Sequence, residues 1–299
     1  MKRHLTATLL SVIFLAALAG PACSPEPPAA PGPKGHLLII GGGERTDEIM
    51  ERFTALAAAH DTGRIVIFTM ATGVPDEVRQ ETQAEYERRG VEDFAIHHLT
   101  REEALAPDAV KILDGAGGVF FTGGDQSRLT AVLLGTPVLD AVRRIYAEGG
   151  IIGGTSAGAA VQSELMITGG ANRAEDPDDP WRAILADNIV LAQGFGFVKN
   201  AVIDQHFVAR RRNNRLISVV LENPSLVGVG IEESTAVLVR PDGAFEVLGE
   251  GQVVVYDARR AKTAKTEDGH LGAHGLTMHV LLPGDVYDLA AGRVEEPAK

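Results

Sequence analysis

Cysteine, aromatic residues, basic residues and long apolar runs are all scarce in this chain of 299 residues. A single cysteine excludes an intrachain disulfide and a zinc site built from cysteines. Aromatic residues make up 5%, which argues against an aromatic-rich β-sandwich. Without a run of about 18 apolar residues, no membrane-spanning helix is expected. The chain has 40 acidic and 28 basic residues, and its net charge of -12 argues against nucleic-acid binding over the whole surface.

Glycine and hydrophobic residues, in contrast, are abundant. A hydrophobic content of 45% excludes a disordered chain, and the length suits one large domain or two small ones. The 34 glycines favour an α/β protein with tight turns between strands and helices.

The N-terminus has the features of a secretory signal peptide in their usual order. Lys2 and Arg3 precede an apolar run from Leu9 to Leu18, and small residues follow this run. We therefore predict a signal peptide over residues 1–22. The protein is expected to be exported, as a periplasmic, outer-membrane lipoprotein or extracellular protein.

Cys23 follows this segment and begins a Pro-rich tether over residues 23–35, which can form neither helix nor sheet. At this place a cysteine resembles the lipid-modified first residue of a bacterial lipoprotein, which would tether the protein to a membrane. It is otherwise an incidental residue of the leader, because Gly20-Pro21-Ala22 matches the usual Leu-led signal poorly. Both alternatives stay open.

From residue 36 onward, apolar strands alternate with helical segments. Continuous apolar strands separated by helices indicate a doubly wound, mostly parallel sheet with helices on both faces. The strand expected over 201–207 belongs to this same sheet. We predict a main domain over residues 36–258, in which β-hairpins after residue 231 extend the sheet edge. Residues 259–299 are expected to form a polar loop up to 275 and a short final hairpin over 278–292.

The segment Gly154-Thr155-Ser156-Ala157-Gly158 fits the G-x-S-x-G turn that presents a nucleophilic serine. A chance match is plausible in a glycine-rich chain. The apolar strand before the turn and the Ala-rich helix after it favour the functional interpretation. Ser156 is therefore the candidate nucleophile.

His206 ends an apolar strand and follows Asp204 and Gln205. A lone histidine is usually structural, but a serine nucleophile needs a base, and histidine is the usual one. Four arginines come next, at positions 210, 211, 212 and 215. They form either a solvated helix face or a site that binds carboxylates. In the second case Asp204 could pair with a substrate guanidinium.

Glycine turns follow two other strands. Gly123 and Gly124 could supply backbone N–H groups to an oxyanion, or could form only a turn before a helix capped by Asp125. The segment 41–43 is interpreted as a turn only, and it lacks a dinucleotide-binding pattern. His97, His98, His270 and His274 have no ligand constellation beside them. We therefore expect neither a metal nor another cofactor.

Four of these segments, taken together and in order, resemble one family. GGDQ (123–126), GTSAGAAV (154–161), DQHF (204–207) with R-x-R-x-x-R-L after it, and GIEESTA (230–236) are similar to cyanophycinases, relatives of the aspartyl dipeptidase peptidase E. The resemblance covers about residues 36–257. It implies a serine-type hydrolase on a flavodoxin-like sheet, usually a homodimer. Such enzymes release β-Asp-Arg dipeptides from cyanophycin, a poly-aspartate with arginine on each side-chain carboxyl.

The resemblance also implies roles for individual residues. Ser156 is the nucleophile of an acyl-enzyme mechanism, His206 its base, and Gly124 and Ala157 the oxyanion donors. The substrate-binding positions are Gln126, Asp204, Gln205, Arg210, Arg212 and Arg215. The triad acid is expected soon after the segment 166–170, where Glu175 is favoured by spacing and Asp176 is the next candidate.

Two other functions stay open. An aspartyl dipeptidase would share Ser156 and His206 but would act on a free N-terminal aspartate. A catalytically inactive, secreted binding protein could retain the same fold.

Overall fold

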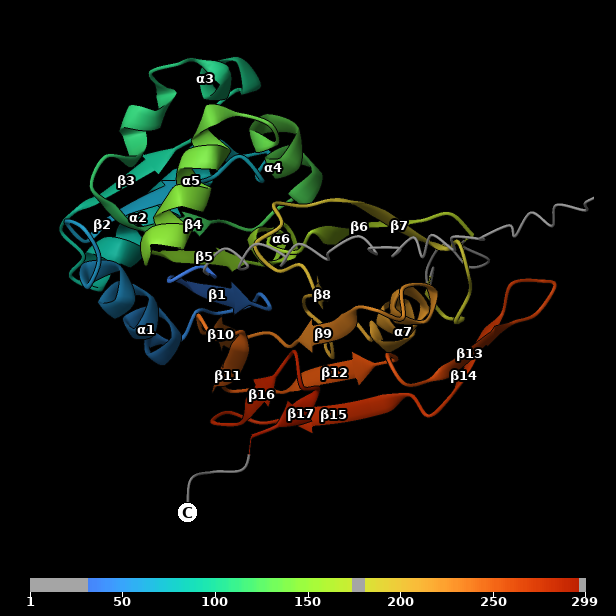
Figure 1. The fold of residues 1–299 in the computed structure, drawn as a ribbon. Helices are drawn as coiled ribbons and strands as arrows, with labels where there is room; N and C mark the ends of the chain where they lie inside the picture. The colour runs from blue at the N-terminus through green and yellow to red at the C-terminus, as the bar shows by residue number, and fades with distance from the viewer. Residues whose placement is uncertain (1–31, 174–180, 296–299) are drawn as a thin grey trace, which may run out of the picture. The chain divides into compact units, whose positions relative to one another are not determined.

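The computed structural model describes residues 32–173 and 181–295, and these described residues belong to one compact unit. Its largest sheet has nine strands in the order β17-β16-β11-β10-β1-β5-β4-β2-β3 (Figure 1). The five strands from β1 to β3 in this order are parallel to one another: β1 (His36–Ile40), β5 (Ile151–Thr155), β4 (Ala116–Phe121), β2 (Arg64–Phe68) and β3 (Phe94–His97). The other four continue the sheet beyond β1, and each is antiparallel to the strand before it: β10 (Thr235–Val239), β11 (Ala244–Gly249), β16 (Val286–Asp288) and β17 (Arg293–Val294).

Helices cover both faces of the parallel part. One face packs against α1 (Asp47–Ala58) and α2 (Pro75–Arg88). The other packs against α3 (Arg101–Leu105), the 3-10 helix η1 (Ala109–Leu113), α4 (Gln126–Leu133), α5 (Pro137–Glu148) and α6 (Ala157–Ala160).

The two-sided burial of β1 explains why residues 37–40 are all apolar. Leu37 and Ile39 face the α5 side, whereas Leu38 and Ile40 face α1, and all four are buried. Successive side chains in a strand point to opposite faces, so a strand covered on both faces needs no polar position. The predicted doubly wound sheet is confirmed.

A second sheet of four strands, in the order β15-β12-β9-β8, was not predicted. It consists of β8 (Ala201–Asp204), β9 (Val227–Ile231), β12 (Val253–Asp257) and β15 (Thr277–Leu281), and α7 (Asn213–Glu222) packs on one face. The prediction that the strand before His206 joins the main sheet is therefore wrong. A buried apolar strand satisfies either sheet equally well, and its sequence does not select its neighbour. A hairpin of β6 (Leu165–Ala171) and β7 (Ile189–Gln193) connects the two regions.

The C-terminal segment also differs from expectation. The predicted loop contains a hairpin of β13 (Lys262–Lys265) and β14 (Leu271–His274), which lies beyond α7 in Figure 1. The predicted final hairpin does not form, because β15 pairs with β12 and β16 pairs with β11. Leu281 and Tyr287 are buried in the main core, so this segment completes both sheets.

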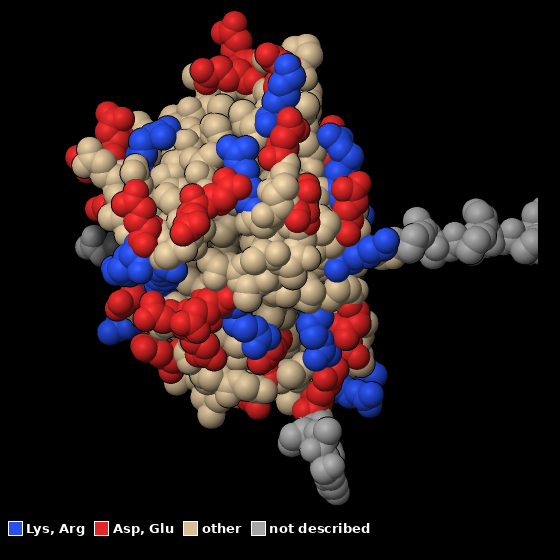
Figure 2. Space-filling model, turned by 90° about the vertical axis from the view of Figure 1, so that its left-hand side faces the viewer, with Lys and Arg blue, Asp and Glu red and all other residues tan. Residues whose placement is uncertain are grey.

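The surface in Figure 2 carries basic and acidic side chains interspersed over one face. Across the described residues, no helix is long and apolar enough to cross a membrane.

Candidate active site

Ser156 lies in the sharp turn between β5 and α6, as the sequence predicts. Its backbone is left-handed, with φ 54° and ψ -108°, a conformation that is costly for a residue with a side chain. The flanking glycines are needed because a Cβ at Gly158 would lie 2.7 Å from the carbonyl carbon of Phe121, and one at Gly154 would overlap Gly158. The turn thus holds the serine at the carboxyl end of a central strand.

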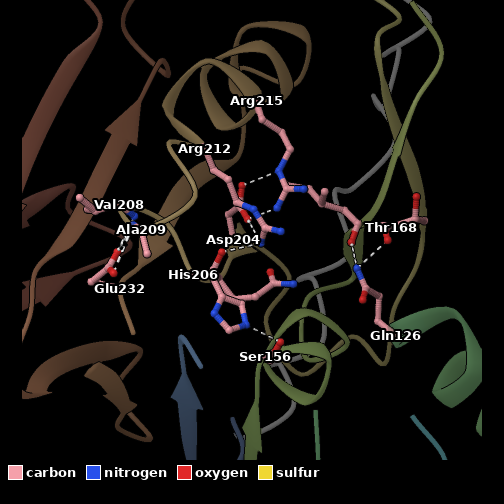
Figure 3. Close-up of polar contacts among 12 residues, drawn as sticks. Gln126, Ser156, Thr168, Asp204, His206, Val208, Ala209, Arg212, Arg215 and Glu232 are labelled. Atoms are coloured by element: carbon pink, nitrogen blue, oxygen red, sulfur yellow. Dashed lines mark hydrogen bonds and ion pairs between the residues drawn. The ribbon is translucent and has the colours of Figure 1, made fainter. Parts of the chain in front are cut away.

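His206 reaches Ser156 from the other sheet. The imidazole Nε2 lies 2.8 Å from Ser156 Oγ, and the residue itself follows β8 (Figure 3). Its backbone N–H donates to Gly41 O at 2.7 Å, which joins the end of β8 to the end of β1. The predicted nucleophile and base are therefore within hydrogen-bonding distance.

The other imidazole nitrogen of His206 faces a carboxylate. Nδ1 lies 2.6 Å from Oε1 of Glu233, whose side chain is 40% exposed. Glu175 and Asp176, the predicted acids, lie outside the described residues. Sequence reasoning missed Glu233, although GIEESTA follows an apolar strand and so offers carboxylates at the carboxyl end of a strand.

The segment 41–43 does more than turn the chain. A Cβ at Gly42 would come within 2.6 Å of His206 Nε2, and Gly42 has a φ of 111°. A Cβ at Gly43 would lie 2.8 Å from the Cβ of Glu233. These two glycines make room for the imidazole and for the carboxylate that contacts it, so the interpretation as a simple turn is incomplete.

Burial is the main cause that lowers the pKa of His206 below its ordinary value. The hydrogen bond and charge of Glu233 act in the opposite direction, and the positive charges of Arg210 and Arg212 lower the pKa further. The imidazole is therefore neutral at neutral pH, in the form that can accept a proton from a serine.

The GGDQ segment borders the serine on another side. A Cβ at Gly123 would lie 3.5 Å from Ser156 Cβ, and Gly124 has a φ of 138°. Asp125 caps α4 by accepting from Ser127 N at 2.8 Å, as one of the two predictions for this turn states. Gln126 donates through Nε2 to the carbonyl oxygens of Ile167 at 2.8 Å and Thr168 at 2.7 Å, so its amide nitrogen is bound to β6.

Asp204, predicted to pair with a substrate guanidinium, pairs instead with arginines of this chain. It is fully buried between Arg215 and Arg212 (Figure 3). Arg215 binds both of its carboxylate oxygens, with Nε 2.9 Å from Oδ2. Arg212 lies 3.6 Å from Oδ1 and donates to Gln205 O at 2.6 Å. Burial lowers the pKa of Arg212 to about 10.

Several buried polar atoms beside this ion pair have no hydrogen-bond partner among the described residues. They are Nη1 of Arg215, Nε of Arg212, Oε1 of Gln205 and Nε1 of Trp181. Trp181 covers both guanidinium groups, with its ring centroid 4.4 Å from Arg215 Cζ and 5.5 Å from Arg212 Cζ. Buried groups of this kind are normally satisfied, so these four atoms mark a place where hydrogen bonding among the described residues is incomplete.

The predicted arginine cluster is therefore divided. Arg210 and Arg211 are exposed, whereas Arg212 and Arg215 are buried. In the described part of the chain, no group of three or more His, Cys, Asp or Glu side chains is arranged to hold a metal ion.

A serine on a strained turn, a histidine within hydrogen-bonding distance and a carboxylate beside that histidine, brought together by two sheets of an α/β fold, define a serine-type hydrolase. Comparison with known proteins agrees with this class. The profile of peptidase family S51 matches residues 37–247. The chain belongs to this family, and it is a serine-type peptidase.

Curated relatives extend over most of the chain. A cyanophycinase of Nostoc sp. is 35% identical over 267 residues, which cover 86% of each chain. One of Synechococcus elongatus is 36% identical and covers 88% of this chain and 82% of its own. One of Geminocystis herdmanii is 31% identical, with coverages of 85% and 94%. The crystal structure of a peptidase from an acI-B1 actinobacterium, 20% identical, shares the fold with a TM-score of 0.61 over 86% of this chain and 98% of its own.

Proposed function

We propose that this chain is an exported cyanophycinase, which hydrolyses cyanophycin to β-Asp-Arg dipeptides. The observation that supports a hydrolytic role is the pair of hydrogen bonds that links Ser156 to His206 and His206 to Glu233. The substrate is suggested by the likeness to curated cyanophycinases and by the unpaired guanidinium atoms near these residues.

In the first step Ser156 Oγ attacks the carbonyl carbon of the scissile amide, and its proton passes to His206 Nε2. Glu233 orients the imidazole and stabilises its charged form, so we assign the role of the triad acid to Glu233 and not to Glu175. The backbone N–H groups of Gly124 and Ala157 would bind the oxyanion. His206 then gives its proton to the leaving amine as the C–N bond breaks, which leaves an acyl-enzyme.

In the second step a water molecule attacks the acyl carbon and loses a proton to His206. The tetrahedral intermediate collapses, the ester bond to Oγ breaks, and Ser156 recovers its proton from the imidazole.

Cyanophycin carries both charges that the neighbouring pocket could recognise. Each arginine is linked through its α-amino group, which leaves its α-carboxylate and its guanidinium free. We assign the carboxylate to the unpaired N–H groups of Arg215 and Arg212, with Arg210 at the exposed side, because arginine binds carboxylates well. Since Asp204 is already paired, we assign the guanidinium to Gln205 Oε1, an unpaired acceptor among the described residues. Gln126, at the start of α4, would hold β6 in place beside the substrate.

Incubation of the purified protein with cyanophycin, followed by mass spectrometry of soluble products, tests this function. We expect β-Asp-Arg dipeptides from the wild type and none from Ser156→Ala. Cleavage of dipeptides with a free N-terminal aspartate, with cyanophycin left intact, would instead indicate an aspartyl dipeptidase. Binding of cyanophycin without any cleavage would indicate an inactive binding protein.

Export is the second part of the proposal, and residues 1–31, including Cys23, lie outside the described residues. The basic, apolar and small residues of the N-terminus support a signal peptide. Cell fractionation should find the shortened protein outside the cytoplasm, and full-length protein in the cytosol would contradict this. If Cys23 is lipidated and tethers the protein to a membrane, labelled palmitate should enter the wild type but not Cys23→Ala.

We also propose a homodimer, as the resemblance implies. Light scattering coupled to size-exclusion chromatography should give twice the mass of the mature chain.

A further inference from the structure

The turn after His206 is conformationally unusual. It connects β8 to α7, and both His206 and Arg211 have left-handed backbones, with φ 49° and 53°. Residues with side chains rarely adopt this region, so the surrounding structure must hold them there. Any bond that fixes this turn also fixes the position of the imidazole.

The first two backbone amides of the turn bind to strand ends. His206 N donates to Gly41 O at 2.7 Å, and Phe207 N donates to Ile231 O at 3.2 Å. Both acceptors are carbonyl groups at the ends of strands β1 and β9, so the beginning of the turn is hydrogen-bonded to both sheets.

The next two amides bind to a side chain. The N–H groups of Val208 and Ala209 both donate to the carboxylate of Glu232, and the distance from Ala209 N is 3.0 Å to Oε2 and 3.2 Å to Oε1 (Figure 3). Glu232 has room for this because a Cβ at Gly251 would lie 3.0 Å from Glu232 Cγ. The backbone N–H of Glu232 donates to Gln252 O at 3.2 Å, which binds it to the residue before β12.

We propose that Glu232 is a positioning residue for His206: it fixes the turn that carries the imidazole, while its neighbour Glu233 binds the imidazole itself. The inference rests on the proposed function, in which His206 is the base. Because Val208 is 44% exposed, water can replace the carboxylate when Glu232 is truncated. The loss of stability should therefore be small, whereas the geometry of proton transfer is sensitive to small displacements.

Two variants and one matched control test this role. Glu232→Ala removes both acceptors, and Glu232→Gln retains one oxygen acceptor on a side chain of the same length. Glu222→Ala is the control, because Glu222 also binds a backbone N–H, that of Asp187 at 2.9 Å, but contacts none of the catalytic residues. For each protein one measures kcat and KM on cyanophycin, the rate at which a fluorophosphonate labels Ser156, and the melting temperature.

We expect Glu232→Ala to lower kcat and the labelling rate by about tenfold or more, with KM nearly unchanged. Glu232→Gln should lie between this variant and the wild type, and Glu222→Ala should equal the wild type. Wild-type rates in a folded Glu232→Ala would overturn the proposal, as would wild-type rates in Glu232→Gln if the alanine variant does not fold.

The labelling rate does not depend on the substrate, so it distinguishes a failure of this proposal from a failure of the substrate assignment. A wild type that is labelled but leaves cyanophycin intact would refute the substrate alone, and the Glu232 comparison would then rest on labelling. A wild type that is not labelled at Ser156 would overturn both.

Discussion

Nδ1 of His206 lies 2.6 Å from Oε1 of Glu233, although 27 positions separate the two residues. The contact arises because β8 and β9 are parallel neighbours in which Asp204 pairs with Gly230. Both residues follow the carboxyl ends of these strands, and such ends meet at one edge of a sheet.

Glu233→Gln should lower kcat on the order of a hundredfold or more, because the imidazole loses its orienting carboxylate. Glu233 also raises the pKa of His206, so its removal should move the acidic limb of the kcat/KM profile to lower pH. Steady-state kinetics across pH measure both effects. Glu175→Gln is the comparison and should behave like the wild type. Loss of activity in Glu175→Gln, with Glu233→Gln unaffected, would mean that Glu175 is the triad acid.

The wild-type kcat/KM should fall as pH decreases, with a midpoint below 6.5, because burial favours the neutral imidazole. Arg210 lowers the pKa of His206, so Arg210→Ala should shift this midpoint upward. Arg211→Ala is the control, since Arg211 is also exposed and is not among the charges that shift this pKa. A downward shift in Arg210→Ala would contradict the assignment.

Gly42→Ala should lower kcat by about a hundredfold or more, because the new methyl group would displace the His206 ring from Ser156. The positive φ adds backbone strain. Gly272→Ala is a suitable control, because a Cβ there would meet nothing within 4 Å. Activity assays with circular dichroism spectra of both variants distinguish displacement from unfolding. A fully active Gly42→Ala would show that the ring is not confined as described.

Arg215→Ala should destabilise the fold by about 3–5 kcal/mol, because the buried carboxylate of Asp204 loses both of its hydrogen bonds to Arg215 and keeps only the Arg212 charge at 3.6 Å. The double replacement Asp204→Leu with Arg215→Met should recover part of this loss, since the buried carboxylate is then removed together with its main partner. Urea unfolding curves measure both, and Arg211→Ala serves as an exposed control. An Arg215→Ala variant of wild-type stability would mean that the pair is not buried in solution.

Trp181 is the only tryptophan of the chain and covers Arg215 and Arg212, so its fluorescence should report ligand binding. Titrating Ser156→Ala with β-Asp-Arg should change the emission of Trp181. The dissociation constant from this titration should equal the one that calorimetry gives. The same titration of Ser156→Ala with Trp181→Phe should give heat but no such emission change. Binding without any change in Trp181 emission would place the ligand elsewhere.

The sequence predicted those features that depend on local pattern. Apolar runs located the strands, glycines marked the turn at Ser156, and the end of an apolar strand marked His206. It did not predict that β8 leaves the main sheet, because both sheets bury the same side-chain types.

Long-range pairing determines the rest of the site. Glu233 was missed because proximity came from the pairing of β8 with β9 and not from spacing after the serine turn. The four arginines were expected to share one helix face or one carboxylate site, but α7 begins at Asn213, and Arg211 precedes it in a left-handed turn. Arg215 consequently faces Asp204 while Arg211 faces solvent.

We propose that Ser156, His206 and Glu233 act as one catalytic unit on cyanophycin. The most direct measurement is the turnover of purified cyanophycin by Ser156→Ala, His206→Ala and the triple variant that also carries Glu233→Gln. Residues of one catalytic unit lose activity non-additively. We therefore predict that either single replacement removes nearly all turnover and that the triple variant is no slower. Substantial turnover by Ser156→Ala, or losses that multiply across the three positions, would contradict the account.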